Sequence, residues 1–197
     1  MSRTEKTLEA LLVSKVRIKV LKFFVMNPNS KLHLRAIVRD IEEEINAVRR
    51  ELARLEEVGI VRSEETLAKK FFEVNKESVF YNEFLLIFHK TYGLGGEIIS
   101  SASQIGKVKY AILTDDYLKQ QHTGGQKIDL VVVGEINLDS LNTIIEEVEK
   151  TLKQEIYFTV FTEKDFYLKK KRRDPFILNM IIKRHVLLIG DHDELIS

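Results

Sequence analysis

The sequence predicts a mixed protein of two small domains, a mainly helical α+β domain followed by an α/β domain. Two patterns predict this. Apolar residues recur at helical spacing in the first part of the chain, whereas β-branched runs of strand length alternate with helical segments after Tyr92–Gly96. The length of 197 residues also suits one large domain or two small ones. We therefore expect domains over residues 1–93 and 94–197.

The first domain is expected to begin with three helices. Apolar residues at helical spacing continue to Phe24, and the helix-breaking pair Asn27-Pro28 follows them. A short second helix is expected at about 34–41 and a third at about 44–58. One apolar stripe runs along the third helix and consists of Ile45, Val48, Leu52 and Leu55.

A β-hairpin is expected after the third helix. Gly59 suits the position just beyond a helix end, where a left-handed backbone is common. Strands are expected at 60–62 and 71–74, with a turn at 65–70 between them. A helix at about 79–103 then leads into the second domain.

The second domain is expected to alternate strands with helices. Apolar runs rich in β-branched residues predict strands at 108–113, 128–133, 156–161 and 186–189. Helices are expected at 138–152, 163–171 and 175–184. Pro175 suits the first turn of the last of these helices, with Asp174 as its N-cap.

Composition and charge exclude several classes of protein. With 44% apolar residues the chain can close a core, and 31 Lys and Arg against 30 Asp and Glu leave a net charge of +1. A nucleic-acid surface must therefore be a local patch, and residues 1–93 hold 17 basic against 14 acidic residues. The lack of cysteine excludes disulfides, thiolate metal sites and thiol nucleophiles. No apolar run approaches about 18 residues and no signal sequence opens the chain, so we expect a cytoplasmic protein without a membrane segment.

Three helices followed by a hairpin is the element order of the winged helix-turn-helix, a DNA-binding module. In this arrangement the third helix enters the major groove and the hairpin, or wing, contacts the backbone. Arginine and asparagine side chains read base edges or bind phosphates. The residues expected to contact double-stranded DNA are Asn46, Arg49, Arg50 and Arg54 on the third helix, and Arg62, Lys69 and Lys70 on the hairpin.

Two features favour a different interpretation of this surface. The arginines could form a solvated helix face that is paired with nearby glutamates. In addition, Glu42, Glu43 and Glu44 precede the third helix, where they favour the helix dipole but would repel a docked phosphate. Either these carboxylates turn away from the duplex or DNA binding is weak.

Several segments together resemble a known family. The stretch LHLRAIVRDIEEEINAVRRELARL, which ends at Leu55, and the following EEVGIVRSEE resemble the winged-helix half of ArsR/MarR-like transcriptional regulators. The whole chain resembles prokaryotic proteins that fuse such a module to a minimal nucleotidyltransferase domain of the DNA polymerase β type. The matching segments are LVSKVRIKVLKFF (Leu12–Phe24), TYGLGGE (Thr91–Glu97), Asp174-Pro175-Phe176 and VLLIGDHDEL (Val186–Leu195).

The resemblance implies a nucleotidyltransferase-like second domain, in which the catalytic groups are degenerate. In the family, a Gly-Ser turn binds nucleotide phosphates, and an Asp-x-Asp pair with a third carboxylate holds two Mg²⁺ ions. Here the first strand ends in Thr114-Asp115-Asp116, Lys127 and Asp129 stand at the Asp-x-Asp positions, and Glu155 begins the third strand. A protonated lysine offers no lone pair to a metal ion, so we expect no catalysis.

Other chemistry has little support in the sequence. Asp115 and Asp116 with His122 could supply a rearranged metal site, although we favour a surface loop for all three. The five histidines lack paired zinc-ligand spacing, and no P-loop or Gly-x-Ser-x-Gly motif is present, so no cofactor is expected. The basic run Lys169–Arg173 suits either phosphate contacts or a solvated helix end.

The leading hypothesis is a DNA-binding transcriptional regulator with an inactive second domain, which serves dimerisation or the sensing of a small-molecule or nucleotide effector. The alternatives are an active nucleotidyltransferase with a rearranged metal site and an antitoxin-like partner protein. Because winged-helix regulators commonly bind DNA as two-fold dimers, we expect a homodimer. The helical segments at about Leu8–Phe24 and 79–103 have apolar residues to spare for it, chiefly Phe80, Phe84, Leu85 and Phe88.

Overall fold

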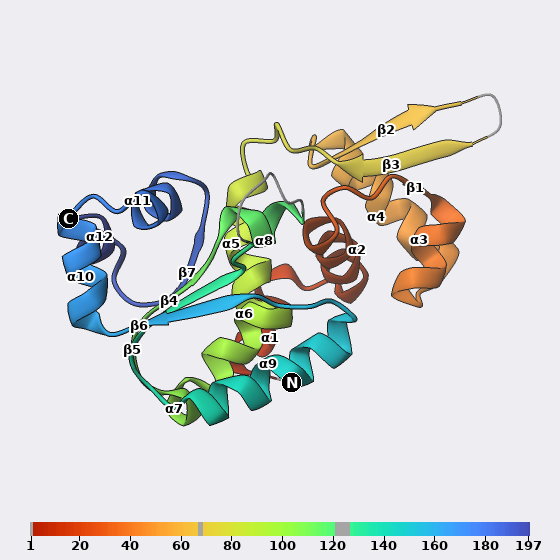
Figure 1. Cartoon of the computed structure of the whole chain (residues 1–197). Coiled ribbons are helices and arrows are strands. Elements are labelled where there is room, and N and C mark those ends of the chain that lie inside the picture. The colour runs from red at the N-terminus through yellow and green to blue at the C-terminus, as the bar shows by residue number, and fades with distance from the viewer. Residues whose placement is uncertain (1, 67–68, 121–126) are drawn as a thin grey trace. The chain divides into compact units, whose positions relative to one another are not determined.

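The computed structural model describes residues 2–66, 69–120 and 127–197 (Figure 1). The chain divides into two compact units, Met1–Phe88 and His89–Ser197, and the boundary falls within helix α5 (Tyr81–Thr91). Each unit combines helices with one sheet, so the fold is of the mixed α and β kind. In the described parts of the chain, every helix is too short or too polar to cross a membrane.

The first unit opens with two helices where the sequence predicted a single helical segment. α1 (Arg3–Leu12) ends at Val13, which has a positive φ of 56°. The hydroxyl of Ser14 then accepts a hydrogen bond from the Arg17 N–H and starts α2 (Lys15–Met26). The continuous helix expected from Leu8 to Phe24 is therefore wrong, because an internal N-cap divides it.

The second and third predicted helices are confirmed as α3 (Leu34–Ile41) and α4 (Ile45–Glu57). Three members of the predicted apolar stripe, Val48, Leu52 and Leu55, are buried on α4. Gly59 has a φ of +72° directly after the end of α4, which confirms its predicted place beyond the helix.

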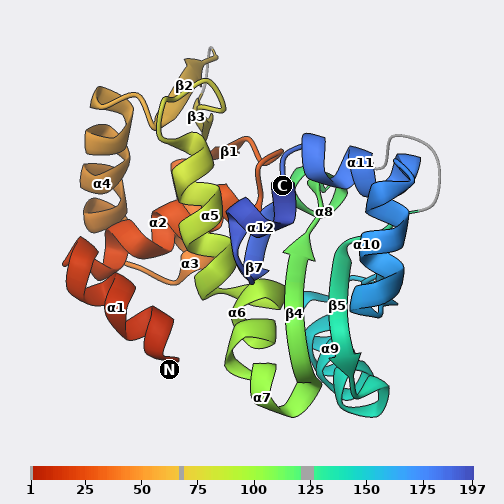
Figure 2. The same ribbon diagram turned by 90° about the vertical axis from the view of Figure 1, so that its left-hand side faces the viewer.

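The sheet of the first unit has three antiparallel strands in the order β1-β3-β2 (Figure 2). β2 (Val61–Glu65) and β3 (Lys70–Val74) form the predicted hairpin. The third strand, β1 (Leu32–His33), was not predicted, and it pairs with the other side of β3. This pairing brings the start of α3 beside the hairpin.

The single helix predicted between the domains is also wrong, because the chain forms α5, α6 (Gly93–Ser100) and α7 (Ala102–Ile105) in succession. The break between α5 and α6 falls at Gly93, which has a left-handed φ of 60°. Gly95 lies so close to α5 that a Cβ atom there would be 1.9 Å from the carbonyl oxygen of His89. The glycines of this segment therefore allow a sharp turn and a close helix contact.

The second unit contains a four-stranded sheet in the order β6-β5-β4-β7. Its strands are β4 (Gly106–Leu113), β5 (Leu130–Ile136), β6 (Phe158–Phe161) and β7 (Val186–Ile189). β4 runs antiparallel to both neighbours, whereas β5 and β6 are parallel. All four predicted strands are confirmed, although β5 and β6 begin two residues later than expected.

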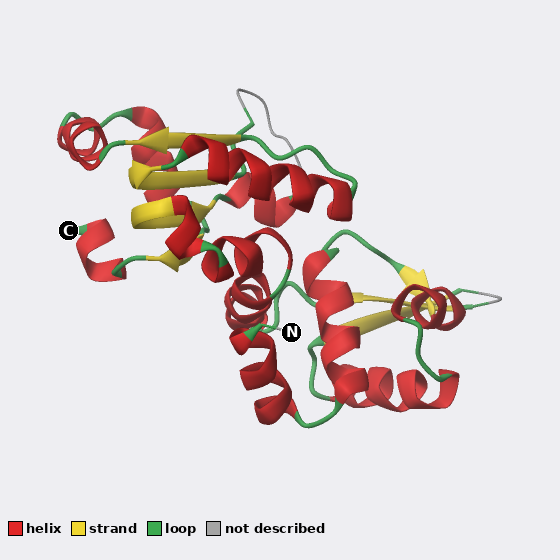
Figure 3. Ribbon diagram, turned by 90° about the horizontal axis from the view of Figure 1, so that it is seen from below, coloured by secondary structure: helices red, strands yellow, loops and turns green. Residues whose placement is uncertain are grey.

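Helices cover both faces of this sheet (Figure 3). α6, α7 and α9 (Leu138–Leu152) pack on one face, and α10 (Glu163–Lys171), α11 (Pro175–Ile182) and α12 (His192–Ile196) pack on the other. The Asp174 carboxylate accepts hydrogen bonds from the N–H groups at the start of α11, which confirms the predicted N-cap. The short helix α8 (Asp115–Lys119) was not predicted.

Candidate nucleic-acid interface

An open groove of about 750 Å³ lies in the first unit between the hairpin, the start of α3 and one side of α4. Its apolar lining comes from Leu34, Ile45, Ala53 and Phe72. Its charged and basic lining comes from His33, Arg35, Arg49, Lys69, Lys70 and the acidic Glu56. The groove therefore combines an apolar surface with an excess of basic side chains, which suits a polyanion.

The exposed side of α4 presents an amide group and a guanidinium group close together. The Arg49 guanidinium donates a hydrogen bond of 2.8 Å to the Asn46 side-chain oxygen, one helical turn away. Both residues are exposed, as is Arg50, whereas Val48 faces the core. The amide and guanidinium groups are thus presented together, next to the groove that Arg49 lines.

Several of the predicted contact residues are engaged in ion pairs within the first unit. Arg54 binds the buried Glu51 carboxylate at 3.0 Å, and Arg62 binds Glu73 across the hairpin at 2.8 Å. The groove brings together three predicted residues, Arg49, Lys69 and Lys70. The other four, Asn46, Arg50, Arg54 and Arg62, do not line it.

Lys70 has an acidic partner within the groove. Its ammonium group lies 2.8 Å from Glu56 and 5.3 Å from the centre of the Phe72 ring. Glu56 also accepts a hydrogen bond from Ser63, and the bonds from Lys70 and Ser63 hold the pKa of Glu56 below its usual value. Lys70 must exchange this partner before it can contact a phosphate.

The three glutamates before α4 each have a local role. Glu42 closes α3 with a left-handed backbone at φ 53°, and Glu43 pairs with Lys19 at 2.7 Å. The Glu44 carboxylate accepts the N–H groups of Asn46 and Ala47, both at 2.8 Å, and these bonds lower its pKa. A carboxylate therefore occupies the N-terminus of α4, so a phosphate cannot dock there.

Sequence reasoning missed His33 and Arg35 as parts of this interface. The His33 ring accepts the Ala36 N–H at 3.0 Å and caps α3, while Arg35 follows in the first turn. Both reach the groove because β1 pairs with β3, which lies about 40 residues further along the chain. A strand of two residues is too short to show a periodic pattern in the sequence, so β1 can be recognised only from its pairing with β3.

A second candidate site lies where β4 ends and β5 and β6 begin. The Thr114 N–H donates to the Asp129 carbonyl oxygen at 3.0 Å, and the Thr114 hydroxyl donates to the Ile128 carbonyl oxygen at 2.5 Å. Thr114 also caps α8, whose first residue is Asp115. The structure thus places the predicted residues Thr114, Asp115, Lys127 and Asp129 together, where β4 ends and β5 begins.

Lys127 and Asp129, which directly precede β5, form an ion pair. The Lys127 ammonium group lies 3.2 Å from Asp129 Oδ2, 3.2 Å from the Glu155 carbonyl oxygen and 4.9 Å from the centre of the Tyr157 ring. Asp129 is completely buried, and its Oδ2 also accepts the Tyr157 N–H at 2.9 Å. The carboxylate is therefore neutralised by lysine and bound to the start of β6.

The two Mg²⁺ ions that the family resemblance implies do not fit these residues. A dication beside Asp129 would meet the Lys127 ammonium group, which repels it and offers it no lone pair. Within the described ranges, no three His, Asp or Glu side chains gather closely enough to hold a metal ion.

The surface-loop interpretation of Asp115 and Asp116 is wrong, because both residues begin α8 and Asp115 is buried. Asp115 Oδ2 pairs with Lys119 at 2.5 Å. His122 lies outside the described residues. Asp115 Oδ1 and Asp129 Oδ1 are buried and accept no hydrogen bond from the described part of the chain. In the basic run, Lys169 pairs with Asp174 at 3.2 Å, which fits a helix end.

Comparison with known proteins gives little further information. No family model matches the chain, and no curated protein matches it. A solved structure, a possible transcriptional regulator from Methanosarcina mazei Go1, aligns with 18% identity and a TM-score of 0.35 over 54% of this chain and 85% of that chain. At this TM-score the likeness carries no argument about the present chain.

Proposed function

We propose that this protein is a DNA-binding transcriptional regulator whose first unit is a winged helix-turn-helix module. The order of α2, β1, α3, α4, β2 and β3 supports this, because the helices of such modules precede a hairpin wing. The observation that carries the proposal is the basic groove, where Arg49 of α4 meets Lys69 and Lys70 of the hairpin. α4 enters the major groove, and the hairpin follows the phosphate backbone.

The side chains have different roles in this proposal. Asn46, Arg49 and Arg50 on the exposed side of α4 read base edges, because amide and guanidinium groups match the patterns of adenine and guanine. Lys69 and Arg35 neutralise phosphates at the rim of the groove. Because Glu44 occupies the N-terminus of α4 and the net charge is only +1, non-specific binding is expected to be weak.

The double substitution Arg49→Ala with Arg50→Ala is expected to reduce sequence preference in duplex binding strongly, with Asn46 left as the remaining base-reading side chain. Each lost bidentate contact removes about 1–3 kcal/mol of discrimination, so affinity for selected sequences falls by about tenfold or more. The measurement is fluorescence anisotropy with duplexes selected from a random pool, beside a random-sequence duplex. A matched control, Lys107→Ala with Lys164→Ala, removes the same charge from the second unit and should leave binding unchanged.

Two outcomes would contradict the proposal. Unchanged binding by the Arg49→Ala, Arg50→Ala protein would show that α4 does not enter the groove of DNA. No duplex binding at low salt would show that the first unit is a protein-interaction module instead. The same titration tests the wing, because Lys69→Ala should weaken all sequences equally and reduce the salt slope by about one unit.

We further propose that the second unit does not catalyse nucleotidyl transfer and serves assembly or effector sensing. The Lys127–Asp129 pair and the missing Gly-Ser turn support this. The alternative, an active enzyme with a rearranged site, rests on two buried carboxylate oxygens, one each of Asp115 and Asp129, that accept no hydrogen bond from the residues the structure describes.

Incubation of the full chain with Mg²⁺ and labelled nucleoside triphosphates is expected to give no labelled product. Lys127→Asp should not create activity, because Thr114-Asp115 still replaces the phosphate-binding turn. Turnover by the wild type that disappears in Asp129→Asn would establish the enzyme instead. We choose Asn because its side-chain oxygen can still accept the Tyr157 N–H.

A further inference from the structure

The two edges of the four-stranded sheet differ in how well they are covered. At one edge, Val186, Leu187 and Leu188 of β7 are buried. At the other edge, all four residues of β6 are half-exposed, and the preceding Tyr157 is 46% exposed. β6 is therefore the more exposed of the two edge strands.

The pairing of β6 with β5 determines which backbone groups point outward. The Leu130 N–H donates to the Tyr157 carbonyl oxygen at 3.2 Å, and Leu130 is the register partner of Phe158. In a parallel ladder this pattern directs Thr159 and Phe161 toward β5 and the N–H and C=O groups of Phe158 and Val160 away from it. These outward groups have no hydrogen-bond partner in the described part of the chain.

β6 is short, which limits pairing with another strand, but it lacks the other features that protect an edge. Its sequence, FTVF, has no charged residue and no proline, and its pairing with β5 has no bulge. Natural edge strands commonly carry such features, which prevent pairing with a second chain. The edge is therefore a template for strand addition.

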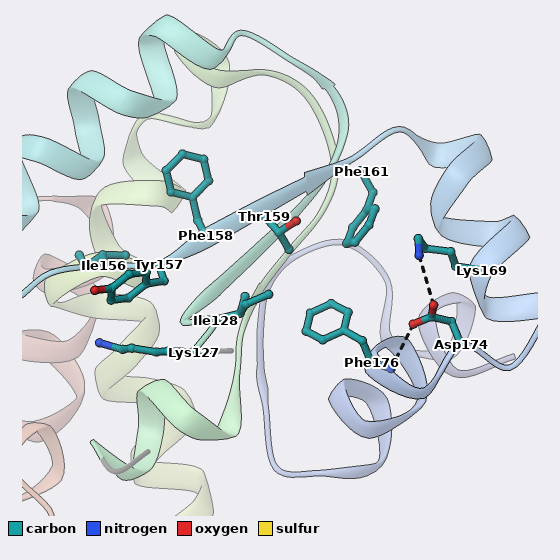
Figure 4. A pocket seen from close by; sticks show the side chains of 10 residues that line it. All are labelled: Lys127, Ile128, Ile156, Tyr157, Phe158, Thr159, Phe161, Lys169, Asp174 and Phe176. Atoms are coloured by element: carbon teal, nitrogen blue, oxygen red, sulfur yellow. Dashed lines mark hydrogen bonds and ion pairs between the residues drawn. The ribbon is translucent and has the colours of Figure 1, made fainter. Parts of the chain in front are cut away.

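An open pocket of about 700 Å³ adjoins the same strand (Figure 4). Tyr157, Thr159 and Phe161 line it from the β6 side. Its other apolar lining comes from Ile128, Ile156, Phe158 and Phe176, and its charged lining from Lys127, Lys169 and Asp174. The rings of Phe161 and Phe176 lie 6.3 Å apart between the strand and α11. An added strand would place its own side chains over this apolar surface.

We propose that a second copy of this chain adds its β6 antiparallel to this edge and forms a two-fold dimer with a continuous sheet. In the register that pairs Phe158 with Val160 of the partner subunit, all four outward groups of β6 form hydrogen bonds. Thr159 then lies opposite Thr159 of the partner subunit, and Tyr157 opposite Phe161 of the partner subunit. The strand is self-complementary in this register, because threonine meets threonine and aromatic meets aromatic.

In this dimer one partner covers both the unpaired edge of β6 and the apolar pocket beside it. Residues opposite each other in antiparallel strands face the same side of the sheet, so the partner's Tyr157 and the partner's Phe161 lie on the pocket side. The interface differs from the helical one that the sequence suggested. Leu85 and Phe88 of α5 are buried and cannot form the expected surface, although Phe80 is 58% exposed.

Sedimentation of the full chain tests the proposal, with an expected mass of twice 22.9 kDa that falls on dilution. Thr159→Lys and Thr159→Glu should each weaken dimerisation by at least about tenfold, because like charges then lie directly opposite each other. An equimolar mixture of the two variants should restore the dimer. Thr143→Lys and Thr143→Glu, on the exposed side of α9, are matched controls that should dimerise like the wild type.

Hydrogen exchange of the wild type gives a second readout without substitution. The Phe158 and Val160 amides should become protected as concentration rises, whereas the Thr159 and Phe161 amides are protected throughout. A monomer at all concentrations, unchanged dimerisation of Thr159→Lys, or a mixture that fails to pair would overturn the proposal. Binding of the Thr159 variants to a single DNA half-site should not change, so this test is independent of the proposed DNA interface.

Discussion

Replacement of Glu51 by alanine is expected to lower the free energy of unfolding of the first unit by about 1.5–3 kcal/mol, because it removes the hydrogen bonds between a buried carboxylate and two partly exposed arginines. The Glu51 side chain is 7% exposed and lies 2.9 Å from Arg17 on α2 and 3.0 Å from Arg54 on α4. The Ser14 hydroxyl also donates to it at 3.1 Å. Burial, the largest single influence, would raise the pKa of Glu51, but the bonds from Arg17 and Ser14 and the charges of Arg17 and Arg54 together lower it.

The consequence for function is that Glu51 fixes α4 against α2. Without the carboxylate, the half-buried Arg17 and the cap of α2 lose their shared partner, and α4 loses its bond to α2. Urea unfolding followed by hydrogen exchange at α2 and α4 amides measures the loss in this unit. Glu57→Ala, at an exposed position of the same helix, should change stability by less than about 0.5 kcal/mol.

A second comparison separates the ion pair from the cavity left by truncation. Glu51→Gln keeps most of the volume of the side chain and one acceptor for Ser14, but it removes the charge that compensates Arg17. It should therefore also be destabilising. A Glu51→Ala protein within about 1 kcal/mol of the wild type would show that the pair contributes little to the packing of α4.

Acidification is expected to destabilise the second unit through His89. This side chain is 3% exposed, neither ring nitrogen has a hydrogen-bond partner in the described residues, and the ring packs edge-on against Tyr117 at 5.6 Å. Burial lowers the pKa of His89 from 6.5 to about 4. The folded state therefore keeps the imidazole neutral at pH values where the unfolded chain binds a proton.

The sign and size of the effect follow from proton linkage. Above pH 6.5 both states are neutral, so His89 makes no pH-dependent contribution. Between pH 6.5 and about 4 only the unfolded state gains the proton, and stability falls by about 2 kcal/mol at pH 5 and roughly 3 kcal/mol below pH 4. The measurement is the unfolding free energy of the second unit at pH 7 and pH 5.

His89→Phe is expected to remove this part of the pH dependence, because phenylalanine keeps a ring against Tyr117 and binds no proton. His192→Gln, at an exposed position, is the control and should keep the wild-type dependence. An equal loss of stability between pH 7 and pH 5 in the wild type and in His89→Phe would show that His89 is not the responsible group.

The sequence by itself determined the elements whose signals are local. The apolar stripe of α4, the glycine after its end and the Asp174 cap of α11 each depend on residues within about one or two helical turns, and each is confirmed. The four strands of the second unit are also visible as apolar β-branched runs. The predicted ends of these strands are less accurate, because pairing with the neighbouring strand decides where each strand begins.

Breaks and short elements were decided by contacts that periodicity does not record. The apolar pattern continues across Val13 and across Gly93, yet the chain changes direction at both residues. α8 has five residues and depends on Thr114, which also binds the Ile128 carbonyl oxygen just before the neighbouring strand β5. Such elements are stabilised by tertiary partners rather than by their own sequence.

The chemistry of the two sites shows the same division. The sequence supplied the basic residues of the first unit and the lysine beside Asp129, since residue type and spacing are properties of the chain alone. Only the tertiary structure decided that Arg54 and Arg62 bind glutamates while Arg49 lines the groove beside Lys69. Ion pairs depend on distances between groups that can be far apart in sequence, such as Arg17 and Glu51, and folding alone sets those distances.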